Sequence, residues 1–208
     1  LPIYDGIYVL LKEVIDNCIA EYVMGYGRVI DITLTDKTVS VRDRGRGIPL
    51  GKVIECVSQI NTGAKYDSKA FQKSVGLNGV GTKAVNALSD YFKVQSVRDA
   101  KTTIAEFNRG GLTSHKHEVK TDLPNGTLVT FTADEEIFGR FKYNTEYIEK
   151  MLHNYAYLNV GLKLNFNADA AGVTADEVIR RLLVTIPLTD EEAPARGVPN
   201  VYRSANAG

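Results

Sequence analysis

Two periods in the hydrophobic and polar positions predict a chain that contains both helices and strands. Apolar residues three or four positions apart predict helices over residues 7–24, 53–60, 82–88, 145–158 and 174–183. Alternating apolar and polar residues predict strands over residues 29–35, 38–41, 91–97, 103–108, 127–133 and 162–166. Asp36-Lys37 predicts a hairpin between the first two strands, and the composition beyond Pro187 is typical of a linker or tail.

The first predicted helix carries a polar line on a mostly apolar surface. Glu13, Asn17 and Glu21 are four residues apart and therefore lie on one face. A solvated stripe is one interpretation of this line. Asp16 and Asn17 favour a functional one, because both residue types are unfavourable inside helices.

Two polar side chains fall on rows that are otherwise apolar. Val39, Val41 and Asp43 share a face of the second strand, so a carboxylate ends an inward-facing row. Burial there is costly unless the carboxylate accepts a hydrogen bond. Thr127 begins the same kind of row in a later strand. Residues 44–49, R-G-R-G-I-P, predict a tight, shaped turn after Asp43, with an ordinary strand exit as the alternative.

A stretch with three glycines, Gly76, Gly79 and Gly81, precedes the helix that starts at Thr82. Such a loop can present backbone N–H groups and the positive end of the helix dipole to an anion such as phosphate. A plain strand-to-helix turn is the alternative. The pattern G-x-x-x-x-G-K-[ST] is not matched, because Thr82 stands where lysine is needed. Residues 65–74 are polar and predict either a lid over a ligand or an ordinary surface loop.

Length and composition allow one large domain, or a domain with an appendage, because the chain has 208 residues of which 44% are apolar. Lys and Arg number 25 and Asp and Glu number 25, so no overall field attracts nucleic acid or an anionic membrane. We expect a cytoplasmic protein, since the sequence shows neither a membrane-spanning run nor the basic start of a signal peptide. Cys18 and Cys56 lie in apolar helical patterns and are expected to be free thiols.

Four motifs occur in the order found in the GHKL ATPases. They are Glu13-x-x-Asp16-Asn17, Asp43-x-Gly45-x-Gly47, Gly76-Leu77-Asn78-Gly79-Val80-Gly81 and Gly126-Thr127. The runs V-S-V-R-D-R-G-R-G-I-P and V-G-L-N-G-V-G-T-K-A-V-N-A-L-S resemble the ATPase subunits of bacterial type II topoisomerases, the group that contains the B subunits of topoisomerase IV and gyrase. The short passage between Pro49 and Ile54 favours the topoisomerase IV type. The resemblance covers residues 6–166.

The resemblance implies an α+β fold, a two-layer α/β sandwich whose mixed, mostly antiparallel sheet is covered on one face by helices. It implies an ATP-binding domain over residues 1–167, followed by a C-terminal helix and a linker or tail over residues 168–208. The implied activity is ATP hydrolysis, with Mg²⁺, coupled to DNA strand passage. The implied partners are DNA through other domains, a DNA-cleaving partner subunit, a second ATPase subunit on ATP binding, and aminocoumarin-type inhibitors.

The resemblance also implies roles for individual residues. Glu13 would be the general base that activates the attacking water, and Asn17 would ligate Mg²⁺. Asp43 would accept a hydrogen bond from the adenine amino group, with Thr127 in support. Glu21 and Arg46 would form an ion pair beside the base. The residues implied to bind the nucleotide are Asn17, Asp43, Arg46, Gly47, Ile48, Pro49, Lys65, Gly76, Leu77, Asn78, Gly79, Val80, Gly81, Thr82 and Thr127.

The sequence departs from the family pattern at several positions. Arg44 stands where the family more often has an acidic, Asn or aromatic residue, and we expect it to alter the rim of the pocket. Ala20 replaces an acid, and Ile104 stands where many gyrases carry an arginine that contacts inhibitors. The family's N-terminal arm and its Q-T-K motif are not found in the sequence, so we expect a monomer that binds nucleotide and turns it over slowly.

Other functions remain open at this point. One is another GHKL member, such as a MutL-like repair clamp or a histidine-kinase ATP domain. Glu13 argues against the kinase, because passing phosphate to a histidine requires no water-activating glutamate. The remaining alternative is a nucleotide-binding or drug-binding module without significant turnover.

Overall fold

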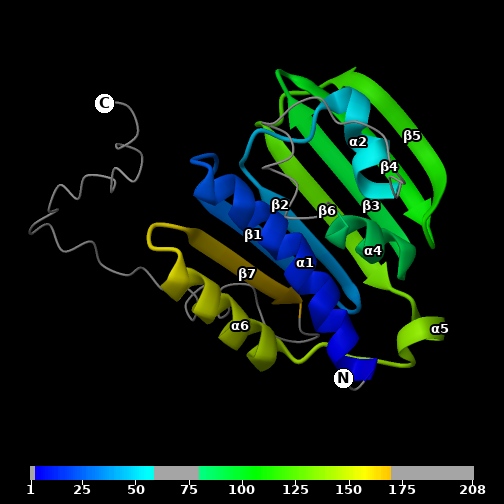
Figure 1. The fold of residues 1–208 in the computed structure, drawn as a ribbon, viewed down its shortest axis with the longest axis vertical. Coiled ribbons are helices and arrows are strands. Elements are labelled where there is room, and N and C mark those ends of the chain that lie inside the picture. Colours follow the sequence, from blue (N-terminus) through cyan, green and yellow to red (C-terminus); the bar gives the residue numbers. More distant parts are fainter. Residues whose placement is uncertain (1–2, 59–79, 170–208) are drawn as a thin grey trace, which may run out of the picture.

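A seven-stranded sheet with helices packed on one face forms the body of the protein (Figure 1). The computed structural model describes residues 3–58 and 80–169. The strands are β1 (Val29–Thr35), β2 (Thr38–Asp43), β3 (Ser89–Arg98), β4 (Lys101–Asn108), β5 (Gly111–Lys120), β6 (Gly126–Ala133) and β7 (Lys163–Asp169). Their order in the sheet is β5-β4-β3-β6-β2-β1-β7, and every neighbouring pair is antiparallel except β1 and β7. The predicted mixed, mostly antiparallel sheet is confirmed.

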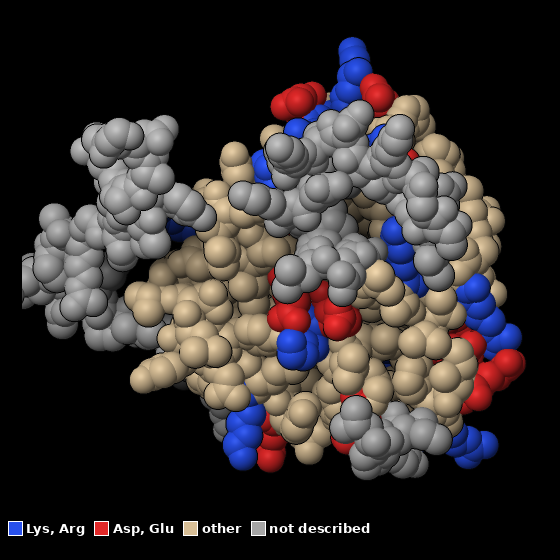
Figure 2. All heavy atoms as spheres, in the orientation of Figure 1, with Lys and Arg blue, Asp and Glu red and all other residues tan. Residues whose placement is uncertain are grey.

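The described helices lie on the same side of this sheet (Figure 1). They are α1 (Ile3–Val23), α2 (Val53–Ser58), α4 (Gly81–Ala87), α5 (Glu135–Phe138) and α6 (Thr145–Leu158), with a 3₁₀ turn over Leu50–Lys52. No helix among the described residues is long and apolar enough to cross a lipid bilayer. Figure 2 shows acidic and basic side chains intermingled over the helical face, which agrees with the balanced composition.

The core lies between α1 and the inner face of the sheet. Six apolar residues of α1 are at most 5% exposed: Ile7, Leu10, Leu11, Val14, Ile15 and Cys18. Buried and half-buried positions alternate along β1 and β2, so every second side chain faces this core. The opposite face of the sheet carries polar pairs such as Ser40 with Thr130, whose hydroxyl oxygens are 2.9 Å apart. One face is therefore apolar and covered by helices, and the other carries polar side chains.

Most predicted elements are present with small shifts at their ends. The second strand continues two residues beyond its predicted end, to Asp43, which is buried at the end of the inward row. Strand β5 and the short helix α5 were not predicted. All ten residues of β5 are exposed, so the strand has no buried row that could produce a hydrophobic alternation. The predicted helix over 174–183, the loop over 65–74 and the tail lie outside the described residues.

Candidate functional site

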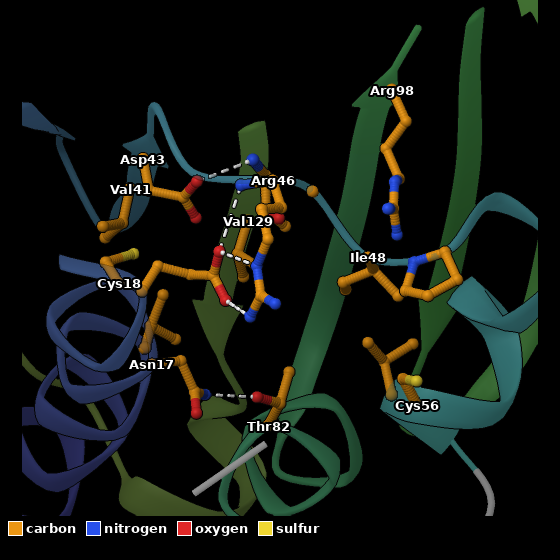
Figure 3. A pocket seen from close by; sticks show the side chains of 16 residues that line it. Asn17, Cys18, Val41, Asp43, Arg46, Ile48, Cys56, Thr82, Arg98 and Val129 are labelled. Atoms are coloured by element: carbon orange, nitrogen blue, oxygen red, sulfur yellow. Dashed lines mark hydrogen bonds and ion pairs between the residues drawn. The ribbon is translucent and has the colours of Figure 1, made fainter. Parts of the chain in front are cut away.

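A cavity of about 290 Å³ opens between α1, the inner ends of β2 and β6, and the segment that follows β2 (Figure 3). Helix α1 contributes one wall, which includes Asn17 and Cys18. Ile48 lies on the opposite wall, with Cys56 of α2 and Arg98 at the end of β3. The cavity therefore gathers segments that are far apart in the sequence.

Asp43 is the buried acid of this cavity and is 5% exposed. Its Oδ1 atom accepts hydrogen bonds from the backbone N–H groups of Gly45, at 2.8 Å, and Thr127, at 3.1 Å. Burial raises the pKa of this carboxyl above its ordinary value, although the two N–H groups act in the opposite direction. Neither of these backbone bonds goes to Oδ2, and the thiol of Cys18 is a further side-chain partner of the carboxylate.

The approach of β6 to Asp43 requires a glycine. Gly126 has a φ of +143°, and a Cβ atom there would lie 2.3 Å from the backbone oxygen of Asp43. Any side chain at this position would therefore push the start of β6 away from the end of β2. The prediction that Gly126 and Thr127 act together with Asp43 rested on the family motif, and the contact explains why the motif needs glycine.

Glu21 and Arg46 form an ion pair at the edge of the cavity, as predicted. Nη2 of Arg46 lies 2.8 Å from Oε1 of Glu21, and Nε lies 3.1 Å from Oε2. The backbone N–H of Arg46 also donates to Oε2, at 3.0 Å. The hydrogen bonds to Glu21 raise the pKa of Arg46, and its guanidinium stacks 4.4 Å from the ring centroid of Tyr26. The pair therefore fastens the turn after β2 to α1.

The segment after this turn is fastened to β3. Gly47 has a φ of +74°, and a Cβ atom on it would lie 2.6 Å from the carbonyl oxygen of Val97. One residue later, the hydroxyl of Ser96 donates to the carbonyl oxygen of Ile48 at 2.6 Å. These contacts fix Ile48 as an apolar wall facing the cavity (Figure 3).

Asn17 and Thr82 meet at the lower end of the cavity in Figure 3. The side-chain amide nitrogen of Asn17 donates to the hydroxyl of Thr82 at 2.6 Å. The amide oxygen of Asn17 takes no part in this bond and remains an oxygen ligand or acceptor. The polar line predicted on α1 is therefore half-buried, and its Asn17 points at the start of α4.

Glu13 lies one turn before Asn17 on α1 and packs against Gly81, the first residue of α4. A Cβ atom on Gly81 would lie 2.0 Å from Oε2 of Glu13, so the absence of a side chain at residue 81 makes room for this carboxylate. Glu13 is half-buried and stands beside the cavity rather than in its lining. Val80, the preceding residue, is exposed.

Some expectations for the site change with the structure, and some lie beyond it. Arg44 was expected to alter the cavity rim; its guanidinium pairs with Asp31 of β1 at 3.0 Å, and the residue does not line the cavity. Ile104 is half-buried on β4 and does not line the cavity. Five residues predicted to bind nucleotide lie outside the described residues: Lys65, Gly76, Leu77, Asn78 and Gly79.

Sequence reasoning did not predict seven further residues of the cavity: Val14, Cys18, Val41, Cys56, Val57, Arg98 and Val129. Both cysteines are free thiols, as expected from the composition. Burial raises the pKa of both, and it places that of Cys56 at about 11. Their apolar helical pattern identified them as core residues, but a pattern along the chain does not show which core residues border a cavity.

Comparison with known proteins identifies relatives for most of the chain. A family model described as "Histidine kinase-, DNA gyrase B-, and HSP90-like ATPase" matches residues 3–137. The B subunit of DNA topoisomerase 4 from Borreliella burgdorferi is 55% identical over 163 residues, which is 78% of this chain and 27% of the relative. The B subunit of DNA gyrase from the same organism is 38% identical over 164 residues, covering 74% of this chain and 26% of the relative.

A solved structure shows the same fold. The 43K ATPase domain of Thermus thermophilus gyrase B, crystallised in complex with an aminocoumarin, matches with a TM-score of 0.69 and 30% sequence identity. The match covers 82% of this chain and 45% of that structure. The chain spans about a quarter of the length of the two curated relatives, 27% and 26%.

Proposed function

Because the chain belongs to the histidine kinase-, DNA gyrase B- and HSP90-like ATPase family, we propose that its cavity binds ATP and that the chain hydrolyses it. The observation that carries the proposal is the buried carboxylate of Asp43, whose Oδ1 is occupied by two backbone N–H groups while Oδ2 is not. The adenine amino group is a donor that suits this acceptor. Guanine carries a carbonyl oxygen at the corresponding position and would leave the buried acceptor unpaired, which disfavours it.

The walls beside Asp43 suit a flat base. Val41 and Val129 line the cavity from neighbouring strands, and Ile48 faces α1 across it. A purine between such apolar surfaces is removed from water on both ring faces, which supplies affinity, while Asp43 supplies the choice of base. We assign Gly47 and Pro49 to the same wall, and Thr127 to the support of Asp43.

Mg²⁺ fits the donor set at Asn17. The amide oxygen of Asn17 is left over from the bond to Thr82, and oxygen is the ligand that this hard cation prefers. No cluster of three His, Cys, Asp or Glu side chains among residues 3–58 and 80–169 could hold a metal alone. Mg²⁺ needs few protein ligands, because it keeps waters and bridges phosphate oxygens. When bound, the ion would neutralise charge on the phosphate groups.

Glu13 is our candidate for the general base. Its carboxylate lies at the start of α4, beside the end of the cavity that Asn17 and Thr82 mark. A base there would accept the proton of a water that attacks the terminal phosphate. We propose that Gly81 and Thr82 contact the phosphates, together with the glycine-rich residues 76–80 and Lys65.

We propose that this chain is the ATPase region of a type II DNA topoisomerase, of the kind found in the topoisomerase IV B subunit. The higher identity to the topoisomerase 4 relative than to the gyrase relative of one organism, 55% against 38%, supports this choice, with the gyrase B subunit as the alternative. ATP would be coupled to DNA strand passage in the cytoplasm through other domains, a DNA-cleaving partner subunit and an ATP-dependent homodimer. We assign residues 1–167 to the ATP-binding domain, and we propose that aminocoumarins bind to it.

Calorimetric titration with a non-hydrolysable ATP analogue and Mg²⁺ tests the proposal. Asp43→Asn keeps an oxygen for Gly45 and Thr127 but replaces the free acceptor by an amide donor, so we expect affinity to fall about 100-fold. Glu13→Ala should bind the analogue within about twofold of the unmutated chain and hydrolyse ATP at least about 100-fold more slowly.

Asp36→Asn is the matched control, because the same chemical change occurs at an exposed turn between β1 and β2. It should change neither binding nor turnover. Equal affinity of Asp43→Asn and the unmutated chain for the analogue would show that Asp43 does not recognise the base. GTP binding as tight as ATP binding would contradict the proposal in the same way.

A further inference from the structure

Two of the three histidines of the chain stand side by side on strand β5. His115 and His117 are two residues apart, so their side chains leave the strand on the same face. Their ring centroids are 5.7 Å apart, and both residues are exposed. Strand β5 ends the sheet at the edge farthest from β7, and none of its residues lines the cavity (Figure 1). The proposed binding of ATP therefore gives this pair of histidines no role.

A β-bulge brings a carboxylate to the same place. The pairing of β4 with β5 shifts register beside Thr103, which therefore faces two residues of β5, His117 and Glu118. Glu118 has a φ of 49°, in the left-handed region that is unfavourable for a residue with a Cβ atom. In a regular strand its side chain would leave on the face opposite to that of His117. The bulge instead places Oε1 of Glu118 3.4 Å from Nε2 of His117.

Thr103 orients the ring of His117. Its hydroxyl oxygen lies 3.3 Å from Nδ1 of His117 and accepts the backbone N–H of Glu118 at 3.2 Å. The hydroxyl can also accept from an Nδ1–H, and in that tautomer the lone pair of the imidazole is on Nε2, which faces the carboxylate. A metal-binding histidine has a partner of this kind on its other ring nitrogen. A lone pair beside an anionic oxygen favours a cation between them.

The distances suit a tetrahedral metal ion. Two ligand atoms that each lie about 2.1 Å from such an ion are about 3.4 Å apart, which is the separation of Nε2 of His117 and Oε1 of Glu118. Two imidazoles on one ion have ring centroids about 5 Å apart, so the ring of His115 has to approach by about 0.7 Å, which is 5.7 minus 5. No three His, Cys, Asp or Glu side chains among the described residues already form a metal site. Binding therefore requires the exposed ring of His115 to turn towards its neighbours.

We propose that His115, His117 and Glu118 form a site on β5 for a divalent transition-metal ion such as Zn²⁺. Two imidazole nitrogens and one carboxylate oxygen leave the fourth position of a tetrahedral ion to water. Imidazole suits zinc, whereas Mg²⁺ prefers oxygen ligands, which separates this site from the Mg²⁺ proposed at Asn17. Lys101 pairs with Oε2 of Glu118 at 3.0 Å and leaves Oε1 for the ion.

Calorimetric titration of the chain with ZnCl₂, in a buffer without chelator, tests the site. His115→Gln, His117→Gln and Glu118→Gln each remove one proposed ligand from an exposed position. His153→Gln is the matched control, because it makes the same change to the third histidine, which is exposed on α6. A titration with MgCl₂ shows whether the site prefers the softer ion.

We expect each of the three ligand variants to bind Zn²⁺ at least about tenfold more weakly, since even a residue that only supports a metal ligand contributes about 10–100-fold in affinity. His153→Gln should bind within about twofold of the unmutated chain. In the NMR spectrum, Zn²⁺ should shift the imidazole ring signals of His115 and His117 and leave those of His153 in place. MgCl₂ should shift none of these signals.

Failure of the unmutated chain to bind Zn²⁺ would overturn the inference, and so would binding that the three ligand variants leave unchanged. A loss in His117→Gln together with full affinity in His115→Gln would show that a single histidine holds the ion and would overturn the chelate. An equal loss in His153→Gln would place the ion elsewhere. These outcomes leave the proposed function untouched, because no residue of β5 lines the cavity.

Discussion

Replacement of Gly81 by alanine tests whether Glu13 acts from the position that it occupies against α4. The added Cβ atom would lie 2.0 Å from Oε2 of Glu13 and 3.0 Å from its Cδ. Ordinary contact begins at 3.4 Å, so the oxygen has to retreat by about 1.4 Å, which is 3.4 minus 2.0. The side chain of Glu13 can rotate, whereas the backbone of α1 is packed in the core. We therefore expect the carboxylate to move and the fold to stay.

The magnitude follows from this displacement. A misplacement of about 1 Å in a catalytic group costs about 10²-fold in rate, which is about 2.7 kcal/mol in the barrier. Helix α4 should not weaken, since alanine is about 1 kcal/mol better than glycine inside a helix. We propose that Gly81 contacts the phosphates through its backbone N–H, which alanine retains, and Glu13 does not line the cavity, so binding of ADP should change less than about twofold.

The assay is single-turnover hydrolysis of ATP with the chain in excess, which also measures slow turnover, beside calorimetry with ADP and a thermal melt. Glu13→Gln removes the base without crowding and should slow hydrolysis by about 10²–10⁴. The double variant should be no slower than Glu13→Gln alone, since both changes remove one function. Gly81→Ala at the unmutated rate, with an unchanged melt, would refute the reasoning, and so would a double variant whose loss is the product of the two single losses.

Three further predictions concern Asp43, Gly126 and Tyr155. Burial raises the pKa of Asp43 above its unfolded value, so the folded state binds this proton more tightly than the unfolded state does. The stability that this proton contributes is present at acid pH and is lost as the pH rises through the folded pKa. Urea unfolding should therefore show that Asp43→Asn gains stability relative to the unmutated chain between acid and neutral pH. In the same assay, Gly126→Ala should lower the free energy of unfolding by about 3 kcal/mol, because it adds a clash to an unfavourable φ. Gly25→Ala is the control, because Gly25 has a φ of +93° but no atom within 4 Å of the added Cβ, and it should lower the free energy of unfolding by about 1 kcal/mol. Tyr155→Phe removes the bond that joins α6 to Asp16 of α1 and should cost about 1 kcal/mol, a fall of about 2–4 °C in Tm; an unchanged Tm would show that this half-buried bond contributes nothing.

The sequence predicts those elements whose apolar and polar side chains alternate with the face that is buried. Helix α1 and the hairpin of β1 and β2 have strict periods, and Asp36 has a φ of 54° in the two-residue turn. Strand β5 has no such pattern, since all of its residues are exposed. Its conformation is fixed by hydrogen bonds to β4, from Asn108 opposite Gly111 to Lys101 opposite Lys120, and these partners are not visible in a local pattern.

The same distinction applies to the cavity. The inward row that ends in Asp43 and the polar line through Asn17 could be predicted, because each follows from the period of its own element. The directions of Arg44 and Arg98 could not, since Arg44 follows the last residue of β2 and Arg98 is itself the last residue of β3. Arg44 pairs with Asp31 on the neighbouring strand β1 instead of lining the cavity. The side chain of Arg98 packs against Gly47 and so lies in the cavity wall.

Asp43 links folding to the proposed recognition of the base through its two oxygens. Oδ1 joins the turn at Gly45 to the start of β6 at Thr127, so it closes the end of β2 against its neighbours. These bonds need the backbone of β6 close to Asp43, which Gly126 permits. The burial that raises the pKa of the carboxyl is partly offset by the same N–H groups. A glycine, a carboxylate and a threonine that are distant in sequence therefore depend on one another, and together they leave Oδ2 of Asp43 without a backbone N–H partner, the oxygen to which we assign the base.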